Sequence, residues 1–275
     1  YTLVYGIIEL INFAHGEIYM LGAFTALLVA GVLGIMGFPA GGILVVAALA
    51  AVVWSAAYGY TLEKVAYKPL RGAPRLSPLI SAIGMSIFLQ NYVLLAQTSD
   101  YVPFPRLLPD MEFLDALGVM GPSDFLILVT STLAMIALSL FIRFTKMGKA
   151  MRATAQNRKM ALLLGINADR IISLTFLVGS ALAALGGVLI ASHMGQVNFG
   201  IGFLAGLKAF TAAVLGGIGS IPGAMVGGLV LGIAESLTTG YLSGNYEDAL
   251  AFGLLILILI FRPDGILGKA KVQKV

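Results

Sequence analysis

The chain of 275 residues contains no cysteine and only two histidines. Without cysteine it can form no disulfide bond, no thiolate metal site and no cysteine nucleophile. Two histidines leave little room for a Ser-His-Asp group or a histidine-spaced metal site, and no pair of catalytic carboxylates stands out. We therefore expect that the chain is not an enzyme and holds no metal or cofactor of its own.

Charged residues are also scarce. They make up 11% of the chain, against about 25% in soluble domains, whereas hydrophobic residues reach 59% and mean hydropathy is +0.97. A soluble fold leaves much of its area in water and cannot hide this much apolar surface. The 34 glycines fit as well, because helices in lipid associate through close packing at small residues. The composition predicts an integral membrane protein.

Apolar stretches of spanning length predict an all-α, polytopic transmembrane helical bundle of about eight spans, forming a single domain over 1–275. The sixth stretch is short and glycine-punctuated, so it is either a full crossing or a broken or re-entrant segment. Residues 1–11 are apolar but too short to span, and we interpret them as the tail of a truncated first helix. The predicted spans are 17–36, 41–60, 76–97, 123–142, 171–192, 203–218, 222–243 and 246–262.

The basic residues predict the orientation. Fifteen of the 17 Lys and Arg residues lie in 61–75, in 143–170 and after residue 261, which are alternate connections of the predicted bundle. The segment 98–122 is instead acidic, and the connections 37–40 and 193–202 carry no Lys or Arg. The positive-inside rule places the basic segments and the C-terminus in the cytoplasm and 98–122 in the periplasm. Because topology explains the net charge of +4, no nucleic-acid partner is expected.

Two stretches resemble each other at an offset of 186 residues. The first begins at Asn12-Phe13 and ends at Ala26, and the second begins at Asn198-Phe199 and ends at Ala212; eight of the fifteen aligned positions are identical. The copies open the first and sixth predicted spans, and an odd difference in span number predicts an inverted repeat. Inverted repeats are typical of transporters, whose pathway lies between the halves. A transporter or channel is therefore favoured over a membrane anchor.

A glycine-rich run occupies 216–228. Gly219, Gly223 and Gly227 recur every four residues, which predicts a helix face that packs closely on a neighbouring helix. The alternative of a phosphate-binding loop fails, because no lysine followed by Ser or Thr completes the Walker pattern. An ATP-driven mechanism would therefore need ATP and magnesium bound by partner ATPase subunits.

The cytoplasmic segment 147–166 within the 143–170 loop is rich in helix formers and too polar to span. We interpret it as a coupling helix on which an ATPase docks; a basic helix that rests on anionic lipid headgroups is the alternative. Gly165 occupies the position of a C-terminal cap. The residues assigned to this docking surface are Met151, Arg152, Ala155, Asn157, Arg158, Leu163 and Gly165.

Few ionisable residues fall in or near the predicted spans: Glu9, His15, Glu17, Lys208 and Glu235. Each is costly in lipid, so each is expected to face the bundle interior or an interface. Glu17 and Lys208 lie in the two repeat copies and could pair, either as a structural clasp or as part of the pathway. Together with the repeat asparagines, the candidate pathway residues are Asn12, His15, Glu17, Asn198, Lys208 and Glu235.

Several motifs resemble a known family. They are the stretch from Ile11 to Glu17, the run from Ser81 to Tyr92, the segment 163–167, the long run from Lys208 to Glu235, and Gly265 to Gly268. Together they are similar to the permease subunits of bacterial branched-chain amino acid ABC importers, the LivH family, across essentially the whole chain. The match to the general importer docking signature is loose, with Ala153-Thr154-Ala155 ahead of Gly165.

The resemblance implies ATP-driven movement of leucine, isoleucine or valine from periplasm to cytoplasm, through a multi-pass protein of the bacterial inner membrane. It also implies a second homologous permease subunit, two ATPase subunits and a periplasmic amino acid-binding protein. The residues alone leave two rivals open, an ion-coupled secondary transporter and a channel for a small polar solute. Nothing in the spans identifies a leucine pocket, so the substrate rests on the resemblance.

Overall fold

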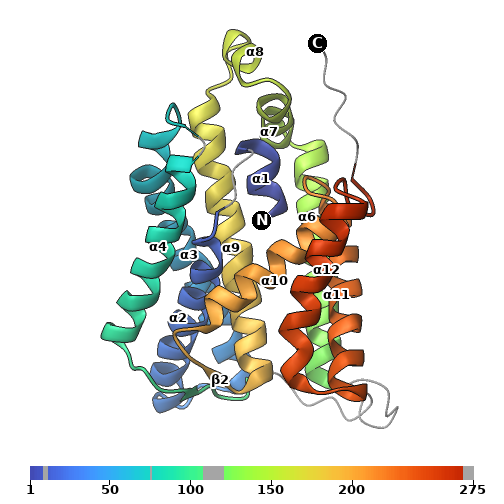
Figure 1. Ribbon diagram of the computed structural model, residues 1–275. Coiled ribbons are helices and arrows are strands. Elements are labelled where there is room, and N and C mark those ends of the chain that lie inside the picture. Colours follow the sequence, from blue (N-terminus) through green and yellow to red (C-terminus); the bar gives the residue numbers. More distant parts are fainter. Residues whose placement is uncertain (9–11, 75, 108–120, 269–275) are drawn as a thin grey trace. The chain divides into compact units, whose positions relative to one another are not determined.

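The computed structural model describes residues 1–8, 12–74, 76–107 and 121–268. Glu9, residues 108–120 of the predicted acidic loop and the basic residues after 268 lie outside the described parts. Within them, seven helical stretches are long and apolar enough to cross a membrane. Five are single helices: α2 (His15–Ile35), α4 (Leu76–Ala96), α6 (Pro122–Phe144), α9 (Ala168–Met194) and α11 (Ile221–Tyr241). The other two are α3 (Ala40–Leu62) with its continuation to Leu70, and α12 (Glu247–Phe261) with the short turn before it from Gly244. The polytopic all-α prediction is confirmed (Figure 1).

The chain divides into two compact units. One holds Phe13–Leu138 and Ser173–Leu204, and the other holds Tyr1–Asn12, Ser139–Ile172 and Ala205–Val275. The helices α6, α9 and α10 (Ile201–Gly216) therefore continue from one unit into the other.

The first unit is built on α2 and α3, which pack along each other and are joined by a tight turn. Gly37 adopts a positive φ of +77°, and its N–H and that of Phe38 bond back to α2 carbonyls, which ends the helix. Small residues bring α2 close to α9: Gly22 lies against Ala184, and Gly187 lies against the backbone of Tyr19. A side chain at either glycine would collide with backbone, so this packing requires glycine.

A short β-bridge in the same unit joins two connections. Val102–Pro103 (β1) pairs antiparallel with Gln196–Val197 (β2), and the N–H of Phe104 bonds to the carbonyl of Gly195. The charges predict that both connections lie on the same side of the membrane, and the bridge agrees with that prediction.

In the other unit, α10 and α11 form a close hairpin. Gly223 and Gly227 of α11 lie against backbone atoms of Gly216 and Ala212, while Ser220 caps α11 by accepting a bond from the N–H of Gly223 at 3.1 Å. Gly219 differs from the prediction, because it lies in the turn before α11 with a φ of +94° and open space where a Cβ would be. It serves the turn and does not share the packing face.

The predicted sixth span corresponds to α10, which has 16 residues. At 1.5 Å per residue this is about 24 Å, shorter than the roughly 30 Å hydrocarbon core. Its first residues follow the β2 bridge, and its last carbonyls accept bonds from Ile266 and Leu267 in the segment after α12. Since the charges place these segments on opposite sides, the contacts favour a short crossing over a re-entrant loop.

The remaining helices are short. α1 (Thr2–Ile8) packs with α7 (Lys146–Gln156) and α11, and α8 (Arg158–Leu163) follows α7 directly. α3 continues as a π-helical turn η1 (Glu63–Tyr67) and a 3-10 turn η2 (Lys68–Leu70), so that its span reaches 31 residues. A last 3-10 turn, η3 (Gly244–Tyr246), precedes α12.

Candidate functional site

The basic loop 143–170 folds into two helices, where a single helix over 147–166 was predicted. The difference arises at Asn157, whose extended backbone ends α7 and whose side chain accepts a bond from the N–H of Met160 at 3.0 Å. An asparagine in this position is a strong helix N-cap and competes with continuation of the preceding helix. Asn157 is thus a corner between two helices.

Gly165 ends α8 as the sequence suggests. It has a φ of +80°, its N–H bonds to the carbonyl of Leu162, and the N–H of Ile166 bonds to that of Ala161. This pair of bonds is the Schellman arrangement, which requires a left-handed residue.

The apolar residues around this corner divide into two groups. Met151 is only 1% exposed and packs inward, so it is not available to a partner. On α8 and just after it, Leu163 and Leu164 are 82% and 78% exposed, and Met160 and Leu162 are also exposed. We call these four residues the α8 apolar patch. Large exposed apolar side chains on a polar helix are typical of an interaction surface.

The other predicted docking residues lie around this patch on the outer side of the loop: Ala155, Asn157, Arg158 and Gly165 are exposed. Arg152 is also exposed, and its guanidinium donates to the carbonyl of Ile142 at the end of α6. In addition, a side chain at Gly148 would collide with the backbone of Ile142. The α7 helix is therefore fixed closely to the end of α6.

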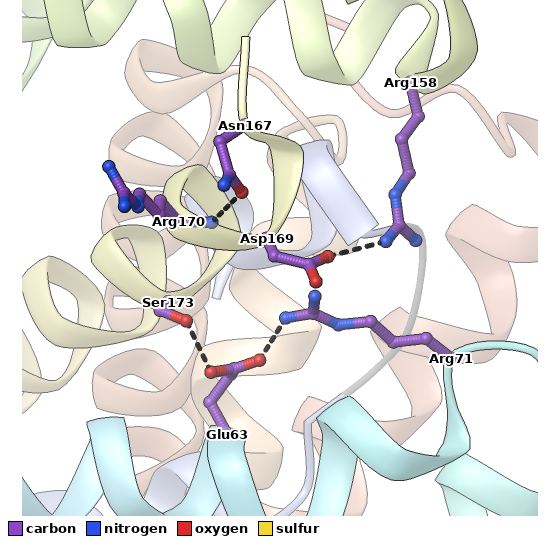
Figure 2. Close-up of polar contacts among 7 residues, drawn as sticks. All are labelled: Glu63, Arg71, Arg158, Asn167, Asp169, Arg170 and Ser173. Carbon is purple, nitrogen blue, oxygen red and sulfur yellow. Dashed lines mark hydrogen bonds and ion pairs between the residues drawn. The ribbon is translucent and has the colours of Figure 1, made fainter. Parts of the chain in front are cut away.

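The α8 helix is fixed in the same way to the start of α9. Arg158 donates to Asp169 at 2.9 Å, and Asn167 caps α9 by accepting a bond from the N–H of Arg170 at 3.1 Å (Figure 2). The docking segment α7–α8 is thus attached to two spanning helices, α6 and α9.

A second polar group lies at the end of α3, and sequence reasoning missed it. Glu63 is fully buried; it accepts a bond from Ser173 of α9 at 2.6 Å and forms an ion pair with Arg71 (Figure 2). A buried carboxylate needs such partners, because leaving it unpaired is strongly unfavourable. The sequence offered one signal for this group, an acidic residue at the edge of an apolar span. It could not identify the partners of Glu63, which are 8 and 110 residues away in the chain.

The repeat copies open their helices at equivalent positions. α2 begins at His15 and α10 at Ile201, each three residues after its asparagine. The Asn198 side chain accepts a bond from the N–H of Gly200 at 3.1 Å, and both Asn12 and His15 are buried. The repeat therefore marks two helix starts, while its inverted orientation stays a prediction.

Glu17 and Lys208 bind partners other than each other. Glu17 is fully buried and accepts a bond from Ser86 of α4 at 2.9 Å. The Lys208 ammonium lies 2.5 to 3.2 Å from three carboxylates, those of Glu235, Glu247 and Asp248. Each group thus has partners within its own unit, and a Glu17–Lys208 pair stays a prediction. The Lys208 group joins α10 to α11 and to the first turn of α12.

The helices and these contacts define a class of protein: a polytopic helical membrane protein whose largest basic loop is folded into a segment with an exposed apolar patch. The chain belongs to the family described as the permease component of the branched-chain amino acid transport system, whose model matches residues 1–259.

Individual relatives agree with the family. The chain is 52% identical over 286 residues to the high-affinity branched-chain amino acid transport system permease protein LivH of Escherichia coli K12, covering 100% of this chain and 91% of the relative. It is 53% identical over 280 residues to BraD of Pseudomonas aeruginosa, with the same coverage. It is also 30% identical over 159 residues to LivM of Escherichia coli K12, covering 55% of this chain and 37% of that permease. No solved structure matches the chain.

Proposed function

We propose that this chain is a transmembrane permease subunit of an ATP-driven importer that moves branched-chain amino acids into the cytoplasm of a bacterium. The observation that carries the proposal is the family match over residues 1–259, together with 52% identity to a high-affinity branched-chain amino acid permease over the whole of this chain. The substrate class follows from these relatives, since the spans themselves contain no recognisable leucine pocket.

The proposal includes a division of labour among several chains. Two ATPase subunits, which bind ATP and magnesium, supply the energy, and a periplasmic binding protein supplies affinity and selectivity. A second, homologous permease subunit completes the pathway. The protein would then lie in the inner membrane, with the basic loops and the C-terminus in the cytoplasm.

The docking segment supports a specific way to couple ATP to transport. The α8 apolar patch offers the surface that an ATPase subunit would cover, and the contacts of Arg152 and Arg158 attach this segment to the ends of α6 and α9. A displacement of α7–α8 when the ATPases close would therefore pull directly on two spanning helices. Switching between outward and inward access is the expected consequence.

Co-purification tests the proposal. Tagged chain, extracted from its native membrane, is expected to co-purify with two kinds of partner: the ATPase subunits and a second permease subunit. The Leu163→Asp variant places a charge in the centre of the α8 apolar patch and should lose the ATPases while it retains the second permease. Lys159→Asp, on the same short helix but outside the patch, is the matched control for a change of charge.

Two results would contradict the proposal. One is a wild-type preparation that contains neither ATPase nor second permease, and the other is leucine uptake by the purified chain alone, driven by a proton or sodium gradient. The second result would favour an ion-coupled transporter.

A further inference from the structure

The two copies of the internal repeat touch each other at an equivalent position. Gly16, in the first turn of α2, and Gly202, in the first turn of α10, are aligned and identical in the repeat. Both lie in the unit that holds Phe13–Leu138 and Ser173–Leu204. A Cβ at Gly202 would lie 2.7 Å from the carbonyl oxygen of Gly16 and 3.0 Å from the Cα of Glu17, so this close approach requires glycine.

The chain reaches these two helix starts from opposite directions. It enters α2 after α1, which packs with α7 of the basic loop, and it enters α10 after the β2 bridge. The charges predict that the basic loop is cytoplasmic and that the bridged connections are periplasmic. The contact between the starts is therefore expected inside the membrane, where transporters built on inverted repeats place their substrate sites.

Glu17 places a carboxylate at this contact. Its side chain is fully buried; Oε1 accepts the bond from Ser86 of α4 at 2.9 Å, and Oε2 lies 2.5 Å from the position that a Cβ of Gly202 would occupy. Among the described residues of its own unit, Oε2 accepts no hydrogen bond and no Lys, Arg or His pairs with the carboxylate. One hydroxyl does not compensate a buried charge, which ordinarily needs an ion partner.

Two other charged groups inside the bundle differ from Glu17 in this respect. Glu63 is also fully buried but is paired with Arg71, and the Lys208 ammonium lies among three carboxylates. Lys208 is the cation that the sequence suggests as a partner of Glu17, yet its own unit already surrounds it with an excess of negative charge. Glu17 thus keeps a free oxygen at the repeat contact, suited to a cation that comes from outside its unit.

We propose that Glu17 binds the α-ammonium group of the amino acid as it passes the contact between α2 and α10. The inference rests on the proposed function, because every branched-chain amino acid carries this group whatever its side chain. An ammonium group supplies both the positive charge and the N–H donors that Oε2 lacks. Gly202 covers Oε2 in this structure, so the site is closed here and opens when α2 and α10 separate during the cycle.

Removal of the charge tests the inference. Glu17→Gln has nearly the same shape and retains an acceptor for Ser86, but it cannot neutralise an ammonium group. In the transporter reconstituted with its partner subunits, the maximum rate of leucine uptake should fall about 10-fold or more, as expected for one charged hydrogen bond. The KM should barely change, because the binding protein sets it, and ATP hydrolysis stimulated by the binding protein should persist.

Thr25→Val is the matched control. Thr25 lies two turns further along α2, and the change removes only a hydroxyl that bonds to the carbonyl of Leu21 in the same helix. This variant should take up leucine at the wild-type rate.

Three results would overturn the inference. Normal uptake by Glu17→Gln would show that the group is a neutral structural acid. An equal fall in uptake, ATP hydrolysis and melting temperature would show that it only stabilises the fold. Recovery of uptake when Lys208→Met is added to Glu17→Gln would assign Lys208 as its partner. A wild-type complex that takes up no leucine would instead defeat the proposed function.

Thiol labelling tests whether the contact opens. The chain has no cysteine, so Ser86→Cys introduces a single thiol beside Glu17 and retains the carboxylate. With ATP and binding protein but without leucine, 2-aminoethyl methanethiosulfonate should modify this thiol several-fold faster than in the resting complex, and leucine should slow the reaction. The mass of the chain reports the modification.

Ala51→Cys, at a fully buried position on α3, is the control thiol and should stay unreactive throughout. A Ser86→Cys thiol that reacts in no state, or whose reaction does not respond to leucine, would overturn the inference, because the Glu17 site would then never meet the substrate.

Discussion

Asp169 and Ser173 lie one turn apart on α9, and their contacts differ in burial. Ser173 bonds to Glu63, which also pairs with Arg71, and in that pair the side chains are 0% and 10% exposed. Asp169 pairs with Arg158, and both of those side chains are nearly half exposed. The two ion pairs therefore differ in the free energy that breaking them requires. Loss of one partner from a buried pair is strongly destabilising, whereas an exposed pair can break and re-form with little change in free energy.

The difference fits the two regions. The Glu63 group fixes the π-helical end of α3 to α9, where rigidity keeps the spans in place. The Arg158 pair holds the docking segment to α9, where an exposed contact that opens with little loss of free energy suits the displacement proposed for this segment. The Lys208 group is intermediate, since its lysine is 24% exposed among three carboxylates.

The largest effect is expected at the buried pair. Arg71→Met leaves the Glu63 carboxylate buried without its ion partner and should lower the free energy of unfolding by about 3–5 kcal/mol. Thermal denaturation in detergent measures the change. The double variant Glu63→Leu with Arg71→Met removes both charges and should recover most of the stability; a double variant as unstable as the single would show that packing, and not the ion pair, dominates.

An intermediate effect is expected for Lys208→Met. It leaves three neighbouring carboxylates without their cation, but their partial exposure allows water to solvate them, so the loss should be about 1–2 kcal/mol. The same denaturation assay applies. Asp248→Asn, at the most exposed of the three acids, is the matched control and should change stability much less. A Lys208→Met loss as large as that of Arg71→Met would remove the distinction between the two groups.

The smallest change in stability is expected for Arg158→Ala. Exposed pairs contribute about 0–1 kcal/mol, so the melting temperature should barely move. Transport that depends on ATP should nevertheless fall several-fold, because the docking segment loses its bond to α9. Comparison of uptake with ATP hydrolysis in the assembled transporter checks this, and equal uptake in wild-type and variant would mean that the pair has no coupling role.

Features that depend on a local sequence pattern, such as helix positions and caps, could be predicted from the sequence. Apolar length located the eight apolar helices α2, α3, α4, α6, α9, α10, α11 and α12 to within a few residues. The repeat located the starts of α2 and α10 at equivalent positions. Gly165 was recognised because a left-handed cap leaves a local signal. Glycine spacing identified Gly223 and Gly227, but Gly219 belongs to the turn, since spacing alone does not distinguish a helix from the residues before it.

Contacts between distant residues were not predictable in the same way. Glu63 and Ser173 are 110 residues apart, and Lys208 and Glu247 are 39 apart, so no periodicity connects them. The corner at Asn157 was missed because the helix formers on both sides outweighed one capping residue. The assignment of Met151 to the docking surface was wrong, because the sequence does not show which face of α7 packs inward.

Uptake of leucine by proteoliposomes tests the central claim most directly. The purified chain is reconstituted with the second permease, the ATPase subunits and the binding protein, and uptake is followed with ATP and magnesium in the absence of any ion gradient. We expect uptake that requires ATP hydrolysis and that Leu163→Asp abolishes through loss of the ATPases. Uptake that persists without ATP or without the ATPase subunits would contradict the account.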